Sequence, residues 1–339
     1  SAAGACPAVL TLLLNTKAMK VFITRRILDS GLQVLEKANI QYTQWTGEAL
    51  LQGDALAEQC QHYDALLNAS GSRIDAPFLQ ASRHLKVIAL HSVGYDNVDI
   101  AAATALKIPV GNTPGVLSNA TADTAFLLLL ATSRKAFYLN STIARGEWKH
   151  FEPTANLGIE LYGKTLGIAG LGKIGYEMAR RCQAAYGMKI IYHNRHVNPQ
   201  AEKDLSATLV TFDALLQQSD VISVHTALTE ETKEMFNAAA FAKMKPGAIF
   251  INTARGGIHN EQDLIAALQQ NIIWGAGLDV TNPEPMLPNN PLLRMPNVAV
   301  LPHIGSATFE ARSAMSRLAA ENIVAGLQGR PLPHWVNPF

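Results

Sequence analysis

The segment TLGIAGLGKIGYEMARRC, residues 165–182, decides the fold of this 339-residue chain. It opens with a short apolar run typical of a buried strand, ends in a helical pattern, and turns between them at Gly170, Gly172 and Gly175. In such a G-x-G-x-x-G turn, the first glycine permits the tight bend, the second lets the backbone approach a pyrophosphate, and the third lets the helix pack closely on the strand. The helix N-terminus then faces the phosphates with free N–H groups. The segment therefore predicts a dinucleotide-binding site.

Short β-rich runs alternate with helical patterns on both sides of this turn, which predicts α/β architecture. From residue 165 onward we expect six buried strands, at 165–170, 189–194, 220–225, 248–253, 275–280 and 298–303. They predict a six-stranded, doubly wound parallel sheet. Before the turn we expect a helix at about 30–38 and strands at 20–24, 63–69, 85–90 and 109–113. A single helix from about Asn119 to Arg145 is too apolar for the surface, so we expect it to pack on another domain or subunit.

Length and composition limit the possible functions. A chain of 339 residues is too long for one core and predicts two domains. Its 28 basic and 27 acidic residues leave a net charge of +1, which offers no field to attract nucleic acid or a membrane surface. Cys6, Cys60 and Cys182 form neither a metal pattern nor a disulfide framework, which fits a reducing compartment and a cytoplasmic location. The apolar run at 8–14 is too short to span a bilayer, and we interpret residues 1–18 as an N-terminal extension.

The end of the second strand after the glycine turn indicates the type of cofactor. An NAD site usually has Asp or Glu there, which bonds the ribose 2′-hydroxyl. The sequence instead reads YHNRHVN at 192–198, with Asn194 in the place of the acid and Arg195 and His196 behind it. A carboxylate would repel a 2′-phosphate, whereas an arginine can pair with one. We therefore expect NADPH, with NADH as the alternative cofactor; in the other interpretation Arg195 only solvates the strand end.

Three chemically versatile side chains follow successive strands of the predicted sheet: Arg255 in INTARGG (251–257), Glu284 in LDVTNPEP (278–285) and His303 in LPHIGSAT (301–308). The carboxyl ends of such strands form the ligand-binding edge. Histidine can donate a proton near neutral pH, and a nearby carboxylate favours its charged form. Arginine can hold a substrate carboxylate and polarise a ketone. Although a lone histidine in a turn is more often a surface or capping residue, the three together predict reduction of a 2-keto acid.

Five motifs carry a resemblance to a known family. HSVGYDNVD (91–99), GLGKIG (170–175), INTARGG, LDVTNPEP and LPHIGSAT occur in the order seen in D-2-hydroxyacid dehydrogenases, which the chain resembles from about Met19 to its C-terminus. The resemblance implies a Rossmann-type dinucleotide-binding domain at 118–307 and a flavodoxin-like, discontinuous substrate domain at 19–117 and 308–339. A last helix at about 306–328 would return to the substrate domain. The resemblance also implies a homodimer that pairs through the nucleotide domain.

The resemblance assigns roles to single residues. Arg255 would bind and polarise the substrate, and His303 would be the acid/base, paired to Glu284. The backbone N–H groups of Val93 and Gly94 would hold the substrate carboxylate, and Asp279 would contact the nicotinamide carboxamide. No metal site is expected. The residues expected around the cofactor are Thr121, Gly170, Leu171, Gly172, Lys173, Ile174, Gly175, Asn194, Arg195, His196, His225, Thr226, Thr253, Ala254, Asp279 and Gly305.

Further segments indicate a branch of the family. ARGEW (144–148), FAKMKPGAIFINTARGG (241–257) and the non-acidic HNR (193–195) are similar to glyoxylate/hydroxypyruvate and 2-ketogluconate reductases. We expect no regulatory domain after residue 339, which disfavours phosphoglycerate dehydrogenases, and formate dehydrogenases use Gln rather than Glu near the active histidine. The expected activity is NADP(H)-dependent reduction of glyoxylate, hydroxypyruvate or 2-ketogluconate to D-2-hydroxy acids. The alternatives are a dinucleotide-binding corepressor-like scaffold, a phosphite dehydrogenase and another D-2-hydroxyacid dehydrogenase.

Overall fold

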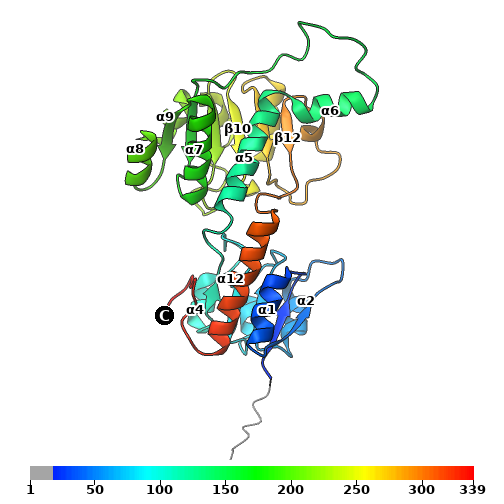
Figure 1. Cartoon of the computed structure of the whole chain (residues 1–339), viewed down its shortest axis with the longest axis vertical. Coiled ribbons are helices and arrows are strands. Elements are labelled where there is room, and N and C mark those ends of the chain that lie inside the picture. The colour runs from blue at the N-terminus through cyan, green and yellow to red at the C-terminus, as the bar shows by residue number, and fades with distance from the viewer. Residues whose placement is uncertain (1–17) are drawn as a thin grey trace, which may run out of the picture. The chain divides into compact units, whose positions relative to one another are not determined.

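The computed structural model describes residues 18–339, which form two compact units (Figure 1). Unit 1 consists of residues 18–91, 98–112 and 316–339, and unit 2 consists of Ser92–Asn97 and Thr113–Met315. The predicted N-terminal extension lies outside the described residues except for Ala18. Both units are parallel α/β sheets, so the predicted fold class is confirmed. No helix within residues 18–339 combines the length and apolar character needed to cross a membrane.

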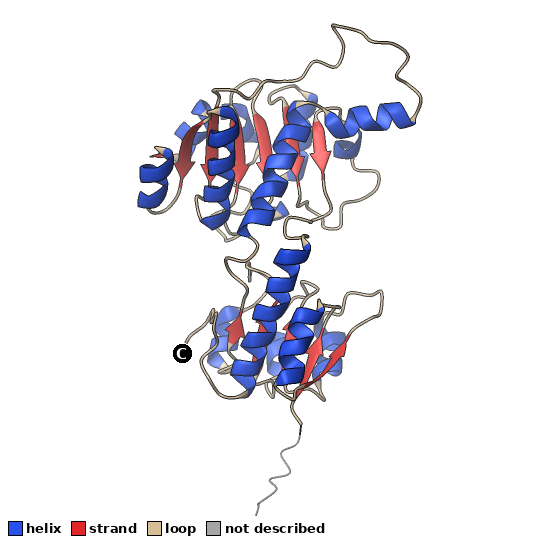
Figure 2. Ribbon diagram, in the orientation of Figure 1, coloured by secondary structure: helices blue, strands red, loops and turns tan. Residues whose placement is uncertain are grey.

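Unit 1 contains a five-stranded sheet with the order β2-β1-β3-β4-β5, the flavodoxin-like arrangement. The strands β1, β3 and β4 are almost fully buried, whereas the edge strand β2 alternates between exposed and half-buried residues. Helices cover both faces of the sheet, as Figure 2 shows. The strands are β1 Lys20–Ile23, β2 Gln41–Gln44, β3 Ala65–Asn68, β4 Val87–Leu90 and β5 Val110–Gly111. The helices are α1 Asp29–Lys37, α2 Gly53–Cys60, α3 Ala76–Ala81, α4 Ile100–Ala105 and the C-terminal part of α12 Phe309–Leu327.

Unit 2 contains a parallel sheet with the order β12-β11-β10-β9-β6-β7-β8. The strand order reverses between β6 and β9, which is where doubly wound sheets bind ligands at the carboxyl ends of their strands. The prediction of six strands was wrong by one, because β8 is a two-residue strand, too short for a periodic pattern to reveal. The strands are β6 Thr165–Ala169, β7 Lys189–His193, β8 Thr208–Leu209, β9 Val221–Val224, β10 Ile249–Asn252, β11 Gly275–Leu278 and β12 Val298–Val300.

Helices form a layer on each face of the unit 2 sheet (Figure 2). The cluster on one face contains buried residues of α5 Ser118–Ser133, α7 Lys173–Tyr186 and α8 Pro199–Leu205. The cluster on the other contains residues of α9 Phe212–Gln218, α10 Ala238–Lys243 and α11 Glu261–Gln269. Two short 3-10 helices, η1 Gly256–Ile258 and η2 Pro291–Arg294, lie in the loops that follow β10 and β11. The strand ends are thereby held on a rigid, two-sided core.

The predicted helix from Asn119 to Arg145 is wrong in its extent, because the structure divides it into α5 and α6 Ala136–Ala144. The break falls at Lys135, which adopts the left-handed conformation with φ of +55°. Neither glycine nor proline marks this position, so the local sequence carries no stop signal. A tertiary contact holds it instead, because the Lys135 ammonium lies 5.0 Å from the centre of the Trp274 ring.

The apolar stretch of α5 is explained within unit 2, contrary to the expectation of packing on another domain or subunit. Leu128 and Leu129 are fully buried in the cluster formed with the unit's own sheet. A Cβ added to Gly277 in β11 would lie 2.9 Å from the Leu128 Cβ, so glycine in this strand lets the helix approach closely. Leu127, by contrast, keeps 47% of its surface exposed.

Candidate active site

The three side chains predicted to be catalytic follow three adjacent strands of unit 2. Arg255 follows β10, Glu284 lies in the loop after β11, and His303 follows β12. Because these strands are parallel neighbours, their carboxyl ends share one edge of the sheet. The segment Ser92–Asn97, which contains Val93 and Gly94, belongs to the same compact unit. All the residues proposed to act on a substrate therefore belong to one unit.

His303 and Glu284 form a direct pair. The His303 Nδ1 and Glu284 Oε1 atoms are 2.5 Å apart, and each side chain keeps over a third of its surface exposed. Partial burial disfavours the charged carboxyl, but the hydrogen bond and charge of His303, the Thr281 N–H and the charge of Arg255 together hold the Glu284 pKa below its usual range. With the carboxylate as acceptor, Nδ1 carries the hydrogen, and Nε2 is the nitrogen left to exchange a proton.

His303 occupies a strained turn that Asp279 holds in place. The φ angle of His303 is +53°, which is unusual for a residue other than glycine. The buried Asp279 carboxylate accepts hydrogen bonds from the N–H groups of Ile304 and Gly305, both at 2.7 Å, and the Asp279 carbonyl accepts one from the His303 N–H. Burial raises the pKa of Asp279 despite these bonds. Sequence reasoning missed this contact, although the aspartate directly follows β11.

Arg255 is oriented by a carboxylate that the sequence analysis did not single out. Its Nε donates to both Asp96 carboxylate oxygens, at 3.0 and 3.2 Å, and its Nη1 donates to the Ala254 carbonyl at 2.7 Å. Nη2 has no hydrogen-bond partner within residues 18–339 and lies against Gly94, where an added Cβ would fall 2.0 Å from it. Asp96 lies inside the HSVGYDNVD motif, which was the available signal. Arg255 and Gly94 are thus brought together, with one guanidinium N–H group left to bind a ligand.

The turn that carries Arg255 is held from beneath by Asn252. The buried Asn252 side chain accepts a hydrogen bond from the Ala254 N–H and donates one to the Arg255 carbonyl, both at 2.9 Å. His259 Nδ1 lies 3.0 Å from the Asn252 Nδ2 atom, and burial lowers the His259 pKa to about 4. Gly256 directly follows Arg255, and a Cβ added to it would lie 1.9 Å from the Thr281 carbonyl oxygen. The segments that carry Arg255 and Glu284 are therefore in close backbone contact.

The glycine turn has the form that a dinucleotide pyrophosphate requires. Gly170 has a φ of +95°, and an added Cβ would lie 2.5 Å from the Thr226 N atom. A Cβ on Gly175 would lie 2.6 Å from the Gly170 carbonyl oxygen, which confirms that helix and strand pack closely there. At Gly172, the N-cap of α7, an added Cβ would meet no described atom within 4 Å, and no side chain caps the helix. Open space beside uncapped helix N–H groups fits a bound phosphate.

Asn194 supports the turn rather than facing solvent. Its Oδ1 accepts a hydrogen bond from the Leu171 N–H at 2.6 Å, and Asn198 donates to the Leu171 carbonyl at 2.9 Å. Arg195 and His196, the next two residues, are exposed. The structure thus joins Asn194 and Leu171 but records no hydrogen bond between them and Arg195 or His196.

The remaining predicted cofactor residues fall into small groups. The His225 ring bonds Ser223 Oγ at 2.8 Å and lies 3.5 Å from Thr253 Oγ1, and burial lowers its pKa to about 3. Thr121 lies beside Gly305, where an added Cβ would be 3.2 Å from the threonine methyl group. Ile174 and Val93 pack against the same small apolar cluster, and the Lys173 ammonium lies near Gly115. No group of three or more His, Cys, Asp or Glu in the described part of the chain is arranged to hold a metal ion.

Comparisons with known proteins agree with this geometry. Residues 126–305 match the family described as D-isomer specific 2-hydroxyacid dehydrogenase, NAD binding domain. The chain is 44% identical to a glyoxylate reductase of Thermococcus litoralis over 322 residues, which cover 94% of this chain and 96% of that protein. It is 43% identical to glyoxylate/hydroxypyruvate reductase B of Escherichia fergusonii over 288 residues, 82% of this chain and 87% of that protein.

A solved structure of a related reductase is similar to this chain in fold as well as in sequence. An NADPH-dependent glyoxylate/hydroxypyruvate reductase from Sinorhizobium meliloti, in complex with NADP and malonate, superposes with a TM-score of 0.80 at 31% identity and covers 94% of this chain and 97% of that one. Sequence and fold agree over nearly the whole described length. The chain therefore belongs to the D-isomer-specific 2-hydroxyacid dehydrogenase family.

Proposed function

We propose that this protein reduces small 2-keto acids, with glyoxylate and hydroxypyruvate as its substrates, to D-2-hydroxy acids. The observation that carries the proposal is the His303–Glu284 pair at 2.5 Å on the same strand edge as Arg255, in the unit that contains the glycine turn. Relatives at 43–44% identity bear the names of glyoxylate and glyoxylate/hydroxypyruvate reductases. Their names support the same substrate class here.

Each residue of the site has its own role in the proposed reduction. A nicotinamide dinucleotide, held by the Gly170–Gly175 turn, supplies the hydride when bound. The free Nη2 group of Arg255 polarises the keto oxygen, and the backbone N–H groups of Val93 and Gly94 hold the substrate carboxylate. As negative charge develops on the keto oxygen, His303 donates a proton from Nε2, and the Glu284 carboxylate stabilises and orients the charged ring. The product gains one hydride on carbon and one proton on oxygen.

A panel assay tests this function. The purified protein is mixed with glyoxylate, hydroxypyruvate, 2-ketogluconate or pyruvate and with either reduced cofactor, and cofactor oxidation is followed by absorbance. We expect glyoxylate and hydroxypyruvate to give the highest kcat/KM. Cofactor binding without turnover of any keto acid would instead support the scaffold alternative, and phosphite-dependent reduction of the oxidised cofactor would support a phosphite dehydrogenase.

Unit 2 is the proposed dinucleotide-binding domain, and it also holds Val93 and Gly94 of the expected substrate domain; unit 1 corresponds to most of the rest of that domain. The unit boundaries lie at 112/113 and 315/316 rather than at the expected 117/118 and 307/308, and unit 2 also contains Ser92–Asn97. We place the protein in the cytoplasm, because Cys60 and Cys182 are buried free thiols whose pKa burial raises to about 12. Such thiols suit a reducing compartment.

NADPH is the proposed cofactor, and Arg195 is the residue proposed to select it. Asn194 places no carboxylate near the ribose, and the exposed Arg195 forms no salt bridge within residues 18–339 that would need to break. A charged hydrogen bond to the 2′-phosphate contributes about 1.5–3 kcal/mol. Replacing Arg195 by serine should therefore lower kcat/KM for NADPH about 10- to 100-fold and leave NADH nearly unchanged.

The matched control for this cofactor test is Arg180→Ser, which removes an equal charge from an arginine that only pairs with Glu177 on α7. We expect this variant to keep the parental cofactor ratio. A parent enzyme with higher kcat/KM for NADH than for NADPH would contradict the proposal.

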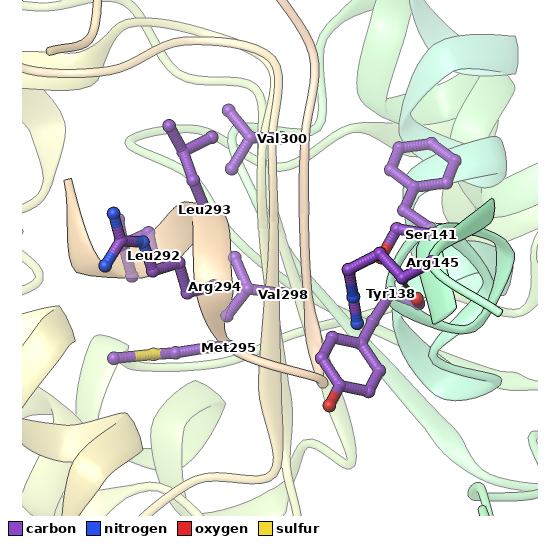
Figure 3. A pocket seen from close by; sticks show the side chains of 10 residues that line it. Tyr138, Ser141, Arg145, Leu292, Leu293, Arg294, Met295, Val298 and Val300 are labelled. Carbon is purple, nitrogen blue, oxygen red and sulfur yellow. Dashed lines mark hydrogen bonds between the residues drawn. The ribbon is translucent and has the colours of Figure 1, made fainter. Parts of the chain in front are cut away.

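A homodimer is proposed from the exposed apolar surface of unit 2. Figure 1 shows α6 and the loop after it projecting from the unit, and large apolar side chains are exposed along this region. They include Phe137, Ile143, Trp148, Phe151, Leu157 and Tyr162, with Trp148 69% and Phe151 82% exposed. Leu127 on α5 and Leu293 in η2 are exposed as well. A groove of about 490 Å³ lies between α6 and the segment 292–300, with Tyr138 and Arg145 on one side and Leu293 and Val300 on the other (Figure 3). An apolar surface of this extent is typical of a subunit interface.

Charge placed in this groove should dissociate the dimer. Phe137 lines the groove and is 37% exposed, so Phe137→Glu would bury a carboxylate in the interface. We expect the dissociation constant measured by sedimentation to rise about 10-fold or more. Leu50→Glu is the control, because Leu50 is an exposed leucine of unit 1. A parent protein that sediments as a monomer at micromolar concentration would contradict the dimer.

A further inference from the structure

Glu261 is a buried acid without a role in the reaction described above. It is the first residue of α11 and keeps only 6% of its surface exposed. Its Oε2 accepts a hydrogen bond from the Asn282 N–H at 3.0 Å, and its Oε1 accepts one from the Asn290 side-chain amide at 2.6 Å. Neither donor belongs to α11. Both lie in the loop after β11, on either side of Glu284.

Apart from Glu261, this loop is anchored by the Glu284–His303 bond and by Met286, a half-buried side chain that packs on the core cluster. Residues 282–285 are exposed, and Leu287 keeps 57% of its surface exposed. The bonds within the loop are local, such as that from the Thr281 hydroxyl to the Pro283 carbonyl at 2.8 Å. A segment with so little apolar burial depends on its hydrogen bonds for its position. The Glu261 carboxylate therefore provides a fixed point two residues before Glu284 and another six residues after it.

The other side of Glu261 is attached to the Arg255 segment. Asn260, the preceding residue, caps α11 by accepting the Asp263 N–H, and its own N–H donates to the Phe236 carbonyl. One residue earlier, His259 contacts Asn252, the side chain that holds the Arg255 carbonyl. Glu261 thus connects the segment that carries Arg255 with the loop that carries Glu284.

We propose that Glu261 is a positioning residue for the reduction: its buried carboxylate sets the place of Glu284, and through it the orientation of His303. The inference rests on the proposed function. Glu261 itself touches neither the proposed substrate contacts nor the glycine turn. Its effect is therefore expected on the proton-transfer step and not on cofactor binding.

The first test is Glu261→Gln, which keeps the shape of the side chain. One glutamine atom can still accept a hydrogen bond, but its NH₂ group must then face one of the two donors. Asn290 cannot compensate by turning its amide, because its Oδ1 already accepts the Leu292 N–H at 3.0 Å. We expect kcat to fall about 10- to 100-fold, the usual cost of displacing a catalytic group by about an ångström. The KM for the cofactor should not change.

The pH profile separates positioning from a general loss of stability. His303 is faced by Glu284 and by Asp279, and Arg255 adds its charge to the surroundings of Glu284. If Glu284 moves away, the imidazole loses the carboxylate that stabilises its charged form. In Glu261→Gln the alkaline fall of kcat should therefore begin at lower pH than in the parent.

Two variants serve as controls. Asp263→Asn removes the same charge from the same helical turn, but Asp263 contacts the Ala238 N–H and not the loop; it should retain the parental kcat and pH profile. In the double variant Glu261→Gln with Asn290→Asp, donor and acceptor exchange places, because the glutamine NH₂ can donate to the new carboxylate. This double variant should recover most of the lost kcat, whereas Asn290→Asp alone sets two carboxylates against each other and should lose activity.

The outcomes distinguish the two proposals. The positioning role would be overturned if Glu261→Gln kept the parental kcat and pH profile. It would also be overturned if the double variant failed to recover a kcat that Asn290→Asp alone had lost. In either case the activity of the parent would still uphold the proposed function. A parent that turns over no keto acid would overturn the proposed function and this inference with it. Thermal unfolding is measured for each variant, and if Glu261→Gln does not fold, the comparison of Asn290→Asp with the double variant decides the question.

Discussion

Replacing His303 by alanine should lower kcat for glyoxylate reduction by about 10²–10⁴, the usual contribution of a positioned general acid. The effect is expected to be large because no other described side chain is placed to take over. His225 and His259 are held neutral by burial, which lowers their pKa values to about 3 and about 4. Among the described residues, His303 is the histidine that joins an exposed imidazole to a carboxylate partner at the strand ends, because the other exposed pair, His150 with Glu152, lies in the loop after α6.

The measurement is kcat with saturating NADPH and glyoxylate or hydroxypyruvate, together with a titration of cofactor binding. The alanine variant should bind the cofactor as the parent does, since the glycine turn is untouched. Nearly parental kcat with normal cofactor binding would mean that His303 is only a surface residue of its turn.

Glu284→Gln is the companion variant, and its effect is a shift in pH dependence. The Glu284 pKa is held below its usual range, so the carboxylate is present through neutral pH and is lost only as the pH falls into the acid range. The amide cannot stabilise the charged imidazole. The alkaline fall in the reduction rate should therefore begin at lower pH than in the parent. An unchanged pH profile of the reduction rate would mean that Glu284 does not stabilise the proton donor His303.

Arg255→Lys should lower kcat/KM about 10²-fold, the cost of removing one preorganised donor. The structure explains why a retained positive charge does not suffice. The guanidinium meets Asp96 with Nε and the Ala254 carbonyl with Nη1, and it still has Nη2 against Gly94. An ammonium group is a single point charge and cannot make these contacts in a fixed plane while binding a keto acid.

The readout for Arg255→Lys is kcat/KM for glyoxylate and for hydroxypyruvate, with KM for the cofactor measured beside it. We expect the loss mainly in capture of the keto acid. Arg180→Lys, on the outer surface of α7, is the matched control and should retain parental kinetics. If Arg255→Lys behaves like this control, the arginine does not bind the substrate.

Part of the candidate site could be predicted from the sequence, and part could not. The strand-end positions of Arg255, Glu284 and His303 could be predicted, because each follows a buried apolar run whose end is visible in the sequence. The contacts of Asp96 and Glu261 could not, because their partners lie far along the chain. Asp96, for example, is separated from Arg255 by 159 residues. Such pairs are set by the path of the folded backbone and leave no local period. Asn252 contacts residues only two to seven positions away, so its role depends on the turn that the chain makes after β10.

The sequence by itself determined the parallel α/β class, the glycine turn and the strand ends, because strand periodicity, helix caps and glycine conformations act over a few residues. Only the tertiary structure decided where α5 stops, since Lys135 takes its left-handed conformation beside Trp274 without a glycine or proline to require it. It also decided the turn at His303, whose positive φ is held by the Asp279 carboxylate 24 residues earlier in the chain. A local conformation that costs free energy is retained only where distant groups stabilise it, and those groups are brought there by the fold.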